Sequence, residues 1–258
     1  MISRLFADRR RLAVLRRIDR PAAVILAILQ ALVAAAGWFA APVWLAVAVA
    51  VQLALGGLAA IYVIGPARSD LGLARYAMPS VAGIAATLIG RLIPGGLSLL
   101  LVPILAVLLW SITYLELRME RGTGGRTIHE VLLTFIVFAA AWGLIGFFGA
   151  QSWPTPLLLL SVFAAPVALR SAEARGTMGV QAVGQALLHL LVVSQVGIAA
   201  VLLSIAPQAM AALVALAFYT WAYAVDALRG GASGRSVAAE AGALTLLGLV
   251  AGLLLHRP

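Results

Sequence analysis

Uninterrupted apolar runs recur from one end of this chain to the other, and a run of roughly 20 residues crosses the hydrocarbon core of a bilayer as a helix. The runs are continuous and rich in Ala, Leu and Gly, without the alternation that membrane strands require. The chain is 64% hydrophobic and 10% charged, with a mean hydropathy of +1.08. Because a soluble domain keeps about a quarter of its residues charged, the sequence predicts an all-α, polytopic transmembrane helix bundle.

We expect about nine spans in a single transmembrane domain at 21–258, preceded by a separate segment at 1–20. The spans are predicted at 21–40, 43–65, 75–92, 96–117, 131–150, 154–169, 180–205, 208–228 and 237–256. The connections after odd-numbered spans are short and almost uncharged, whereas those after even-numbered spans carry charge. Span six is the shortest of the nine and contains Pro166, so its full crossing is the least certain of the set.

The distribution of charge predicts how the chain is oriented. All of the 18 arginines except Arg91 and Arg257 lie in segment 1–20 or in the connections after even-numbered spans, and the carboxylates lie on that same side. Because arginine in short loops marks the cytoplasmic side, we expect a cytoplasmic N-terminus and an outer C-terminus. The net charge of +9 therefore reports topology rather than nucleic-acid binding, and the expected location is a prokaryotic plasma membrane.

Segment 1–20 is rich in arginine and has an apolar side, formed by Leu5, Leu12, Leu15 and Ile18. One interpretation is a basic amphipathic helix that lies on anionic lipid of the inner leaflet. The other is an anchor whose arginines only set the topology. The sequence favours neither interpretation over the other.

Two polar stripes are expected inside the membrane, where polar side chains facing lipid are costly. They consist of Gln181, Gln185, His189 and Gln195 on span seven and of Tyr219, Tyr223 and Asp226 on span eight. We expect both stripes to face protein or a water-filled cavity. They indicate either a pocket or proton path that uses His189, or hydrogen bonds between helices that hold the bundle together.

Carboxylates gather at the inner ends of the predicted spans. They are Asp70, Glu116, Glu120, Glu130, Glu173, Asp226 and Glu240. Two or more of them could hold Mg²⁺, but every one of these loops also supplies an arginine, so ion pairing is the preferred interpretation. The chain contains no cysteine. We therefore expect neither a metal site nor a cofactor.

Asp70 follows span two and Glu173 follows span six, on the predicted cytoplasmic side. Nine helices with a cytoplasmic N-terminus and polar loops at these two places give a layout that is similar to the UbiA-type intramembrane prenyltransferases. The resemblance implies Mg²⁺-binding, Asp-rich motifs in the two loops and catalysis on a lipid. This chain offers a single carboxylate in each loop.

The sequence holds no recognisable catalytic motif, so we expect a non-enzymatic integral membrane protein. It would be a subunit or scaffold of a membrane assembly, as a homo- or hetero-oligomer, or a small-molecule transporter. Small residues at Gly248 and Gly252, and at Ala82, Ala86 and Gly90, allow close helix approach within the chain or between chains. The alternative is a lipid-modifying enzyme at the cytoplasmic face, with the layout described above.

Overall fold

The computed structural model describes the backbone of residues 2–64, 72–93, 95–120, 125–148 and 155–255, and most side chains from residue 21 onward within these ranges. The described part of the chain is an all-α bundle without strands. Its helices are α1 (Ile2–Phe39), α2 (Pro42–Ile64), the 3₁₀ helix η1 (Ala74–Ala77), α3 (Met78–Gly90), α4 (Gly95–Glu120), α5 (Arg126–Phe148), α6 (Thr155–Ala174), α7 (Gly179–Leu202), α8 (Pro207–Arg229) and α9 (Gly234–Leu255). Each predicted span corresponds to one α-helix.

Seven of these helices are long and apolar enough to cross a membrane, which confirms a polytopic membrane helix bundle. The exceptions are α3 and α4. Helix α3 has 13 residues, and its length of about 20 Å falls short of the hydrocarbon core. Helix α4 is 26 residues long, and the apolar stretch among its described residues is Leu100–Glu116. The number of full crossings and the sides on which the termini lie therefore stay predictions.

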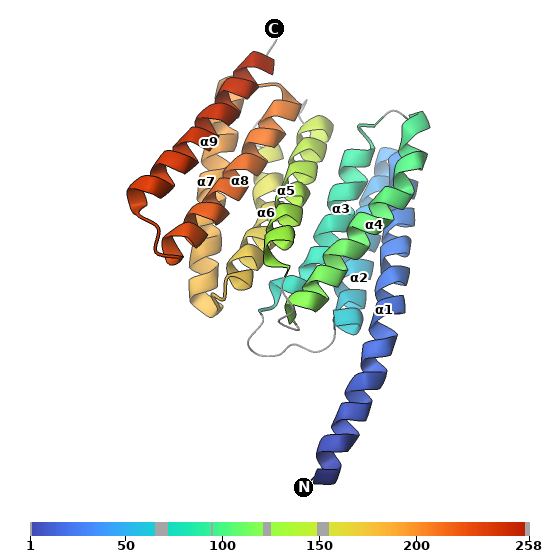
Figure 1. Cartoon of the computed structure of the whole chain (residues 1–258). Helices are drawn as coiled ribbons and strands as arrows, with labels where there is room; N and C mark the ends of the chain where they lie inside the picture. Colours follow the sequence, from blue (N-terminus) through green and yellow to red (C-terminus); the bar gives the residue numbers. More distant parts are fainter. Residues whose placement is uncertain (1, 65–71, 94, 121–124, 149–154, 256–258) are drawn as a thin grey trace.

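The short helix α3 lies inside the bundle, and all but one of its residues are buried. It packs against α1, α2 and α5, so it connects the α1–α4 side of the molecule to the α5–α9 side (Figure 1). Small residues permit this position: a Cβ on Gly56 of α2 would lie 2.3 Å from the backbone nitrogen of Ser80. Two fully buried amides fix the contact, because Gln30 donates to the carbonyl of Pro79 (2.7 Å) and Gln52 donates to the carbonyl of Gln30 (2.8 Å).

Helix α6 continues past the end predicted for span six. It runs through Arg170 to Ala174 and is 20 residues long, enough to cross. The charge at Arg170 suggested a helix end near residue 169. In the structure the guanidinium of Arg170 is buried against a carboxylate from α4, so the helix can carry the charge within its last turn.

Arg91, one of the two arginines that break the charge pattern, closes the end of α1. Its guanidinium donates to the carbonyls of Gly37 (2.7 Å) and Ala40 (2.8 Å) and lies over the ring of Phe147. The last carbonyls of a helix have no partner within the helix, and a cation there is favoured by the helix dipole. Arg91 therefore has a structural reason to lie on the predicted outer side.

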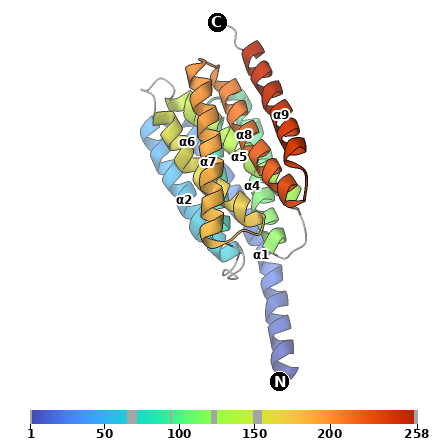
Figure 2. The same cartoon turned by 90° about the vertical axis from the view of Figure 1, so that its left-hand side faces the viewer.

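Segment 1–20 is continuous with the first membrane span instead of forming a separate helix. The single helix α1 extends past the bundle at its N-terminal end (Figures 1 and 2). Pro21 lies inside α1 and removes one backbone hydrogen bond, so the helix is weakest at the boundary between the two parts. In this arrangement contact with inner-leaflet lipid would require a bend at Pro21, and that contact stays a prediction.

Helix α9 lies at the outside of the bundle and packs mainly along α8 (Figure 2). Only 6% of the residues in its apolar stretch, Gly234–Ala251, are buried. Gly248 permits the contact, because a Cβ there would lie 2.3 Å from a side-chain carbon of Leu216 on α8. Gly248, one of the two predicted small residues on this helix, therefore packs against a helix of the same chain. The surroundings of Gly252 lie outside the described residues.

Topology can be measured with reporter fusions. We expect cytoplasmic signals from fusions after Arg121, Arg175 and Arg235, and outer signals from fusions near Gly95, Gln208 and Pro258, because arginine is retained on the cytoplasmic side. A cytoplasmic C-terminus would contradict the nine-span arrangement and would point to α3, with its 13 residues, as a helix that does not cross.

Candidate functional site

A buried ionic cluster joins three helices at one end of the bundle. Glu116 of α4 is fully buried and accepts hydrogen bonds from Arg170 of α6 at 2.6, 2.9 and 3.0 Å. The Nε2 atom of His129, at the start of α5, lies 2.7 Å from the same carboxylate. Charges taken out of water need a partner with good geometry, and a forked guanidinium–carboxylate contact provides it. The cluster therefore ties α4, α5 and α6 together at one end.

A second buried carboxylate, Glu130 of α5, extends this cluster. It accepts from the hydroxyl of Ser171 at 3.0 and 3.1 Å and lies 3.5 Å from the guanidinium of Arg175. Burial lowers the pKa of Arg175 from its ordinary value, and the charge of Glu130 acts in the opposite direction. Arg175 also accepts, through its backbone carbonyl, a hydrogen bond from Arg229 of α8 (3.1 Å). The network thus reaches from α5 and α6 to α8.

The segment before α3 meets the end of α6. Glu173 accepts hydrogen bonds from the backbone N–H groups of Leu73 (3.1 Å) and Ala74 (3.2 Å). Gly72 has a positive φ of 69°, and a Cβ there would collide with the Glu173 carboxylate. Arg170 lies 3.9 Å from the same carboxylate. Glu173 is therefore already satisfied by groups of this chain.

Two other predicted carboxylates lie near the surface, on α8 and α9. Asp226 pairs with Arg126 at 2.5 Å, and Glu240 accepts from the hydroxyls of Tyr223 and Ser236. Asp70 and the side chain of Glu120 lie outside the described residues. No cluster of three or more potential metal ligands occurs in the described ranges.

The expected common face of the span-seven stripe is not what the structure shows. His189 is fully buried, and Gln185 is half-buried and accepts from the hydroxyl of Thr177 (3.1 Å), whereas Gln181 and Gln195 are exposed on the outside of the bundle. Each step of four residues turns about 40° around a helix. Around the axis of α7, His189 therefore lies about 80° from Gln181, on the side away from Gln195. The four residues do not share one helix face.

His189 packs against α8 through its ring and one nitrogen. Its Nε2 atom lies 2.9 Å from the carbonyl of Phe218, and the two rings stack with centroids 4.0 Å apart. A contact with a carbonyl requires the proton on Nε2, which leaves Nδ1 as an acceptor without a partner among the described residues. This geometry is that of a packed interhelical contact.

The span-eight stripe faces away from α7. Tyr219, Tyr223 and Asp226 line a small polar cavity of about 320 Å³ with Arg126 and Glu130 of α5. The two predicted stripes therefore lie on different sides of α8, and the pocket expected between them is not formed by these residues. The sequence showed that both stripes are polar but could not show that α5 and α9, rather than α7, would cover the second one.

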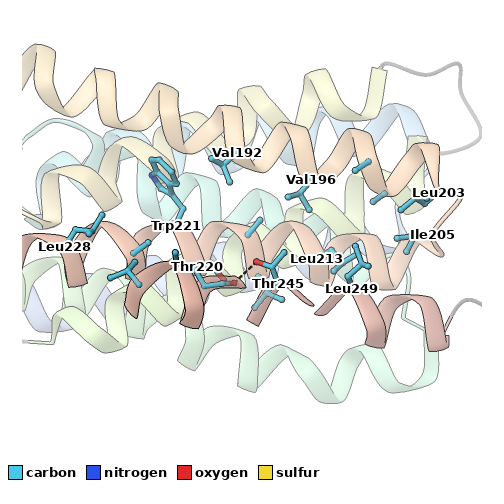
Figure 3. A pocket seen from close by; sticks show the side chains of 18 of the residues that line it. Val192, Val196, Leu203, Ile205, Leu213, Thr220, Trp221, Leu228, Thr245 and Leu249 are labelled. Atoms are coloured by element: carbon cyan, nitrogen blue, oxygen red, sulfur yellow. Dashed lines mark hydrogen bonds between the residues drawn. The ribbon is translucent and has the colours of Figure 1, made fainter. Parts of the chain in front are cut away.

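A larger space lies between α7, α8 and α9, and sequence reasoning did not identify it. It is a groove of about 540 Å³, and Figure 3 shows its wall. None of its lining residues is charged, and its polar side chains are Thr220, Trp221 and Thr245. Thr245 donates to the carbonyl of Ala241, but Thr220 Oγ1 and Trp221 Nε1 are buried without a hydrogen-bond partner in the described chain. We call this space the α7–α9 groove.

A second, smaller apolar cavity of about 230 Å³ lies between α3, α4 and α5. The small residues Ala82, Ala86 and Gly90 line it, so this predicted ridge forms the wall of a cavity and is not covered entirely by another helix. Trp38 of α1 closes one end, donating to the carbonyl of Ala86 at 3.0 Å.

The protein is a polytopic α-helical membrane protein with a buried ionic cluster at one end and an apolar groove along its C-terminal helices. No family model matches the chain, and neither a curated protein nor a solved structure matches it.

The buried ionic cluster can be tested by removing one charge. We expect Glu116→Leu to lower the free energy of unfolding in mild detergent by about 3–5 kcal/mol, because Arg170 is left buried without its partner. The double change Glu116→Leu with Arg170→Met should recover much of this loss. Arg126→Gln, which removes an exposed pair, is the matched control and should cost less than about 1 kcal/mol. Equal stability of Glu116→Leu and the unchanged protein would refute the structural role.

Measurements of stability and of ligand binding can distinguish a packing role of His189 from a role in a binding site. His189→Leu should reduce thermal stability in detergent, since the Phe218 carbonyl loses a contact of about 1 kcal/mol or less and the ring stack is lost. Leu187→Ala, at an exposed position on the same helix, should have a smaller effect. A variant with unchanged stability that no longer binds a ligand would instead place His189 in a site.

Proposed function

We propose that the protein is a non-enzymatic membrane carrier that holds a small hydrophobic molecule in the α7–α9 groove. The observation that carries this proposal is the groove itself. Its volume of about 540 Å³ lies within the range of ligand sites, roughly 300–1,000 Å³. Its lining is apolar with a few polar groups, the composition expected of a site for a lipid-soluble ligand.

The position of the groove supports uptake from the membrane. The groove runs beside α9, the least buried of the apolar helices. A groove between such an outer helix and its neighbours is open to lipid. The two polar atoms without partners, Thr220 Oγ1 and Trp221 Nε1, are themselves buried, so the groove presents an almost entirely apolar surface to a ligand.

Catalysis at the inner face is supported less well. The meeting of the Gly72–Ala74 segment with Glu173 agrees with the layout of the UbiA-type enzymes and favours a lipid-modifying enzyme as the second candidate. However, Glu116, Glu130 and Glu173 each already have partners within the chain. A metal–diphosphate would have to displace these contacts, at the cost of leaving arginines buried and unpaired. A scaffold would use the outer face of α9, which ordinary lipid can cover equally well.

The carrier proposal can be tested by filling the groove. Ala241 of α9 lines it, whereas Ala243 is exposed on the other side of the same helix. We expect the protein purified in mild detergent to retain a hydrophobic small molecule, detected by mass spectrometry of an organic extract. Ala241→Phe should lose that molecule and Ala243→Phe should keep it, with equal amounts of folded protein. Retention of the molecule by Ala241→Phe would contradict the proposal.

A further inference from the structure

The outer face of α7 carries an amide at a depth where the membrane is hydrocarbon. Helix α7 packs against α6 and α8, and its remaining face points out of the bundle (Figure 2). It is 24 residues long, about 36 Å, so a hydrocarbon core of about 30 Å covers all but its two ends. Gln195 is exposed on this face about 10 Å before the last residue, Leu202. Its side chain is shorter than those of the lysines and arginines that reach back to the headgroups from such depths.

Other amides deep in the described helices have partners within the chain. Gln30 and Gln52 are fully buried and donate to backbone carbonyls, and Gln185 accepts from the hydroxyl of Thr177. The amide of Gln195 has no hydrogen-bond partner among the described residues. Because a polar group that faces hydrocarbon is costly, this face of α7 calls for a partner outside the chain.

Gln195 belongs to a stripe of exposed residues that repeats every seven positions. Its members are spaced alternately by three and four residues, and all of them are exposed: Gln181, Gly184, Leu188, Leu191, Gln195, Ile198 and Leu202. At about 100° per residue they fall within an arc of about 100°, on the side opposite the buried residues Ala182 and Val193. This repeat is the one by which two helices pack at a small left-handed crossing angle. We call the stripe the α7 seam.

Gly184 makes the seam suitable for a close approach. A Cβ on Gly197, on the buried side of the same helix, would lie 2.8 Å from a side-chain carbon of Leu157, so that glycine is needed within the chain. A Cβ on Gly184 would meet nothing within 4 Å. A glycine in the middle of a helix lowers its stability, and at a helix surface in the membrane it lets another backbone come near. The chain itself makes no such use of Gly184.

We propose that the α7 seam is the interface of a homodimer, in which the α7 helices of two copies pack in parallel about a two-fold axis. Copies of one chain insert with the same topology, so their α7 helices run in the same direction at the same depth. In such a pair each seam residue faces its counterpart. Gln195 then meets the same glutamine of the second copy, and each amide donates to the other because an amide carries both donors and an acceptor.

The amide selects a second copy over a different protein. Another membrane protein would need a polar group at the same depth on a helix with the same repeat, whereas a second copy supplies both by symmetry. A single polar residue in a helix seam also fixes the register of the two helices. None of the seam residues lines the α7–α9 groove, so this inference does not rest on the carrier function.

Association of the full-length protein can be measured in liposomes by energy transfer between fluorescent labels at increasing protein density. Gln195→Leu should weaken the dimer about 3- to 20-fold, the range expected for lost hydrogen bonds between membrane helices. Gln195→Asn keeps an amide and should retain most of the association. The matched control is Gln208→Leu, which changes an exposed glutamine at the start of α8 and should leave association unchanged. Because Gln195 is exposed, all of these variants should keep the thermal stability of the unchanged protein in detergent.

Cross-linking provides a second measurement, since the chain contains no cysteine. Leu191→Cys should form a disulfide-linked dimer when membranes are oxidised, whereas Leu247→Cys, at an exposed position on α9, should not. Gly184→Phe should reduce association, because its ring has free space in the monomer but separates the two helices in the dimer.

Several results would overturn the proposal. A protein that stays monomeric at every density, or equal cross-linking from both cysteines, would exclude the dimer. Equal association of Gln195→Leu and the unchanged protein would exclude the amide contact. A monomer that co-purifies with another membrane protein, and loses it in Gln195→Leu, would assign the seam to that protein instead. Ala241→Phe should leave the dimer intact, which separates this test from that of the carrier.

Discussion

Pairing of buried charges at one end of the helices determines how this bundle can assemble. Glu116 and Arg170 lie on α4 and α6, far apart in sequence, and neither is accessible to water or to lipid headgroups. A single buried ion in such surroundings costs several kcal/mol, so the fold requires that both helices arrive together. His129 adds the start of α5 to the same carboxylate. The apolar helix surfaces alone would allow many arrangements, since lipid is as apolar as leucine.

Small residues and amides complete the specification on the α1–α3 side. Gly56 allows α2 to approach α3 closely, and Gln30 and Gln52 connect α1, α2 and α3 by hydrogen bonds to backbone carbonyls. Because the backbone of α3 is surrounded, this helix does not need the length of a membrane span. Helix α9 is joined to α8 by the hydrogen bond from Tyr223 to Glu240 near one end, and along the rest of its length it packs on α8 through the surface around Gly248. Its loose packing is what leaves the α7–α9 groove between three helices.

The polar stripes show how the candidate site depended on tertiary structure. Sequence spacing identified His189, Tyr219 and Tyr223 as side chains that need protein contacts, and each of them has such contacts. The spacing could not say which neighbour each helix would have. Gln181 and Gln195 diverge from His189 because a helix turns by 100° per residue, not by a quarter of a turn. The spacing of residues could not predict the groove, because its lining consists of the same alanine, valine and leucine that form the other helix surfaces.

The sequence by itself determined the all-α class, the positions of the helices and the concentration of charge at one end, because helix length and arginine bias are local properties that the bilayer imposes. It also predicted that the carboxylates would pair with arginines. Glu116, Glu130, Glu173 and Asp226 do so, whereas Glu240 accepts hydrogen bonds from hydroxyl groups of Tyr223 and Ser236. Only the tertiary structure decided that the partner of Glu116 is Arg170 rather than a nearer arginine, that α6 continues to Ala174, and that α9 stands off from α7. These features depend on contacts between residues distant in sequence, and the energy of such a contact exists only after both helices have packed.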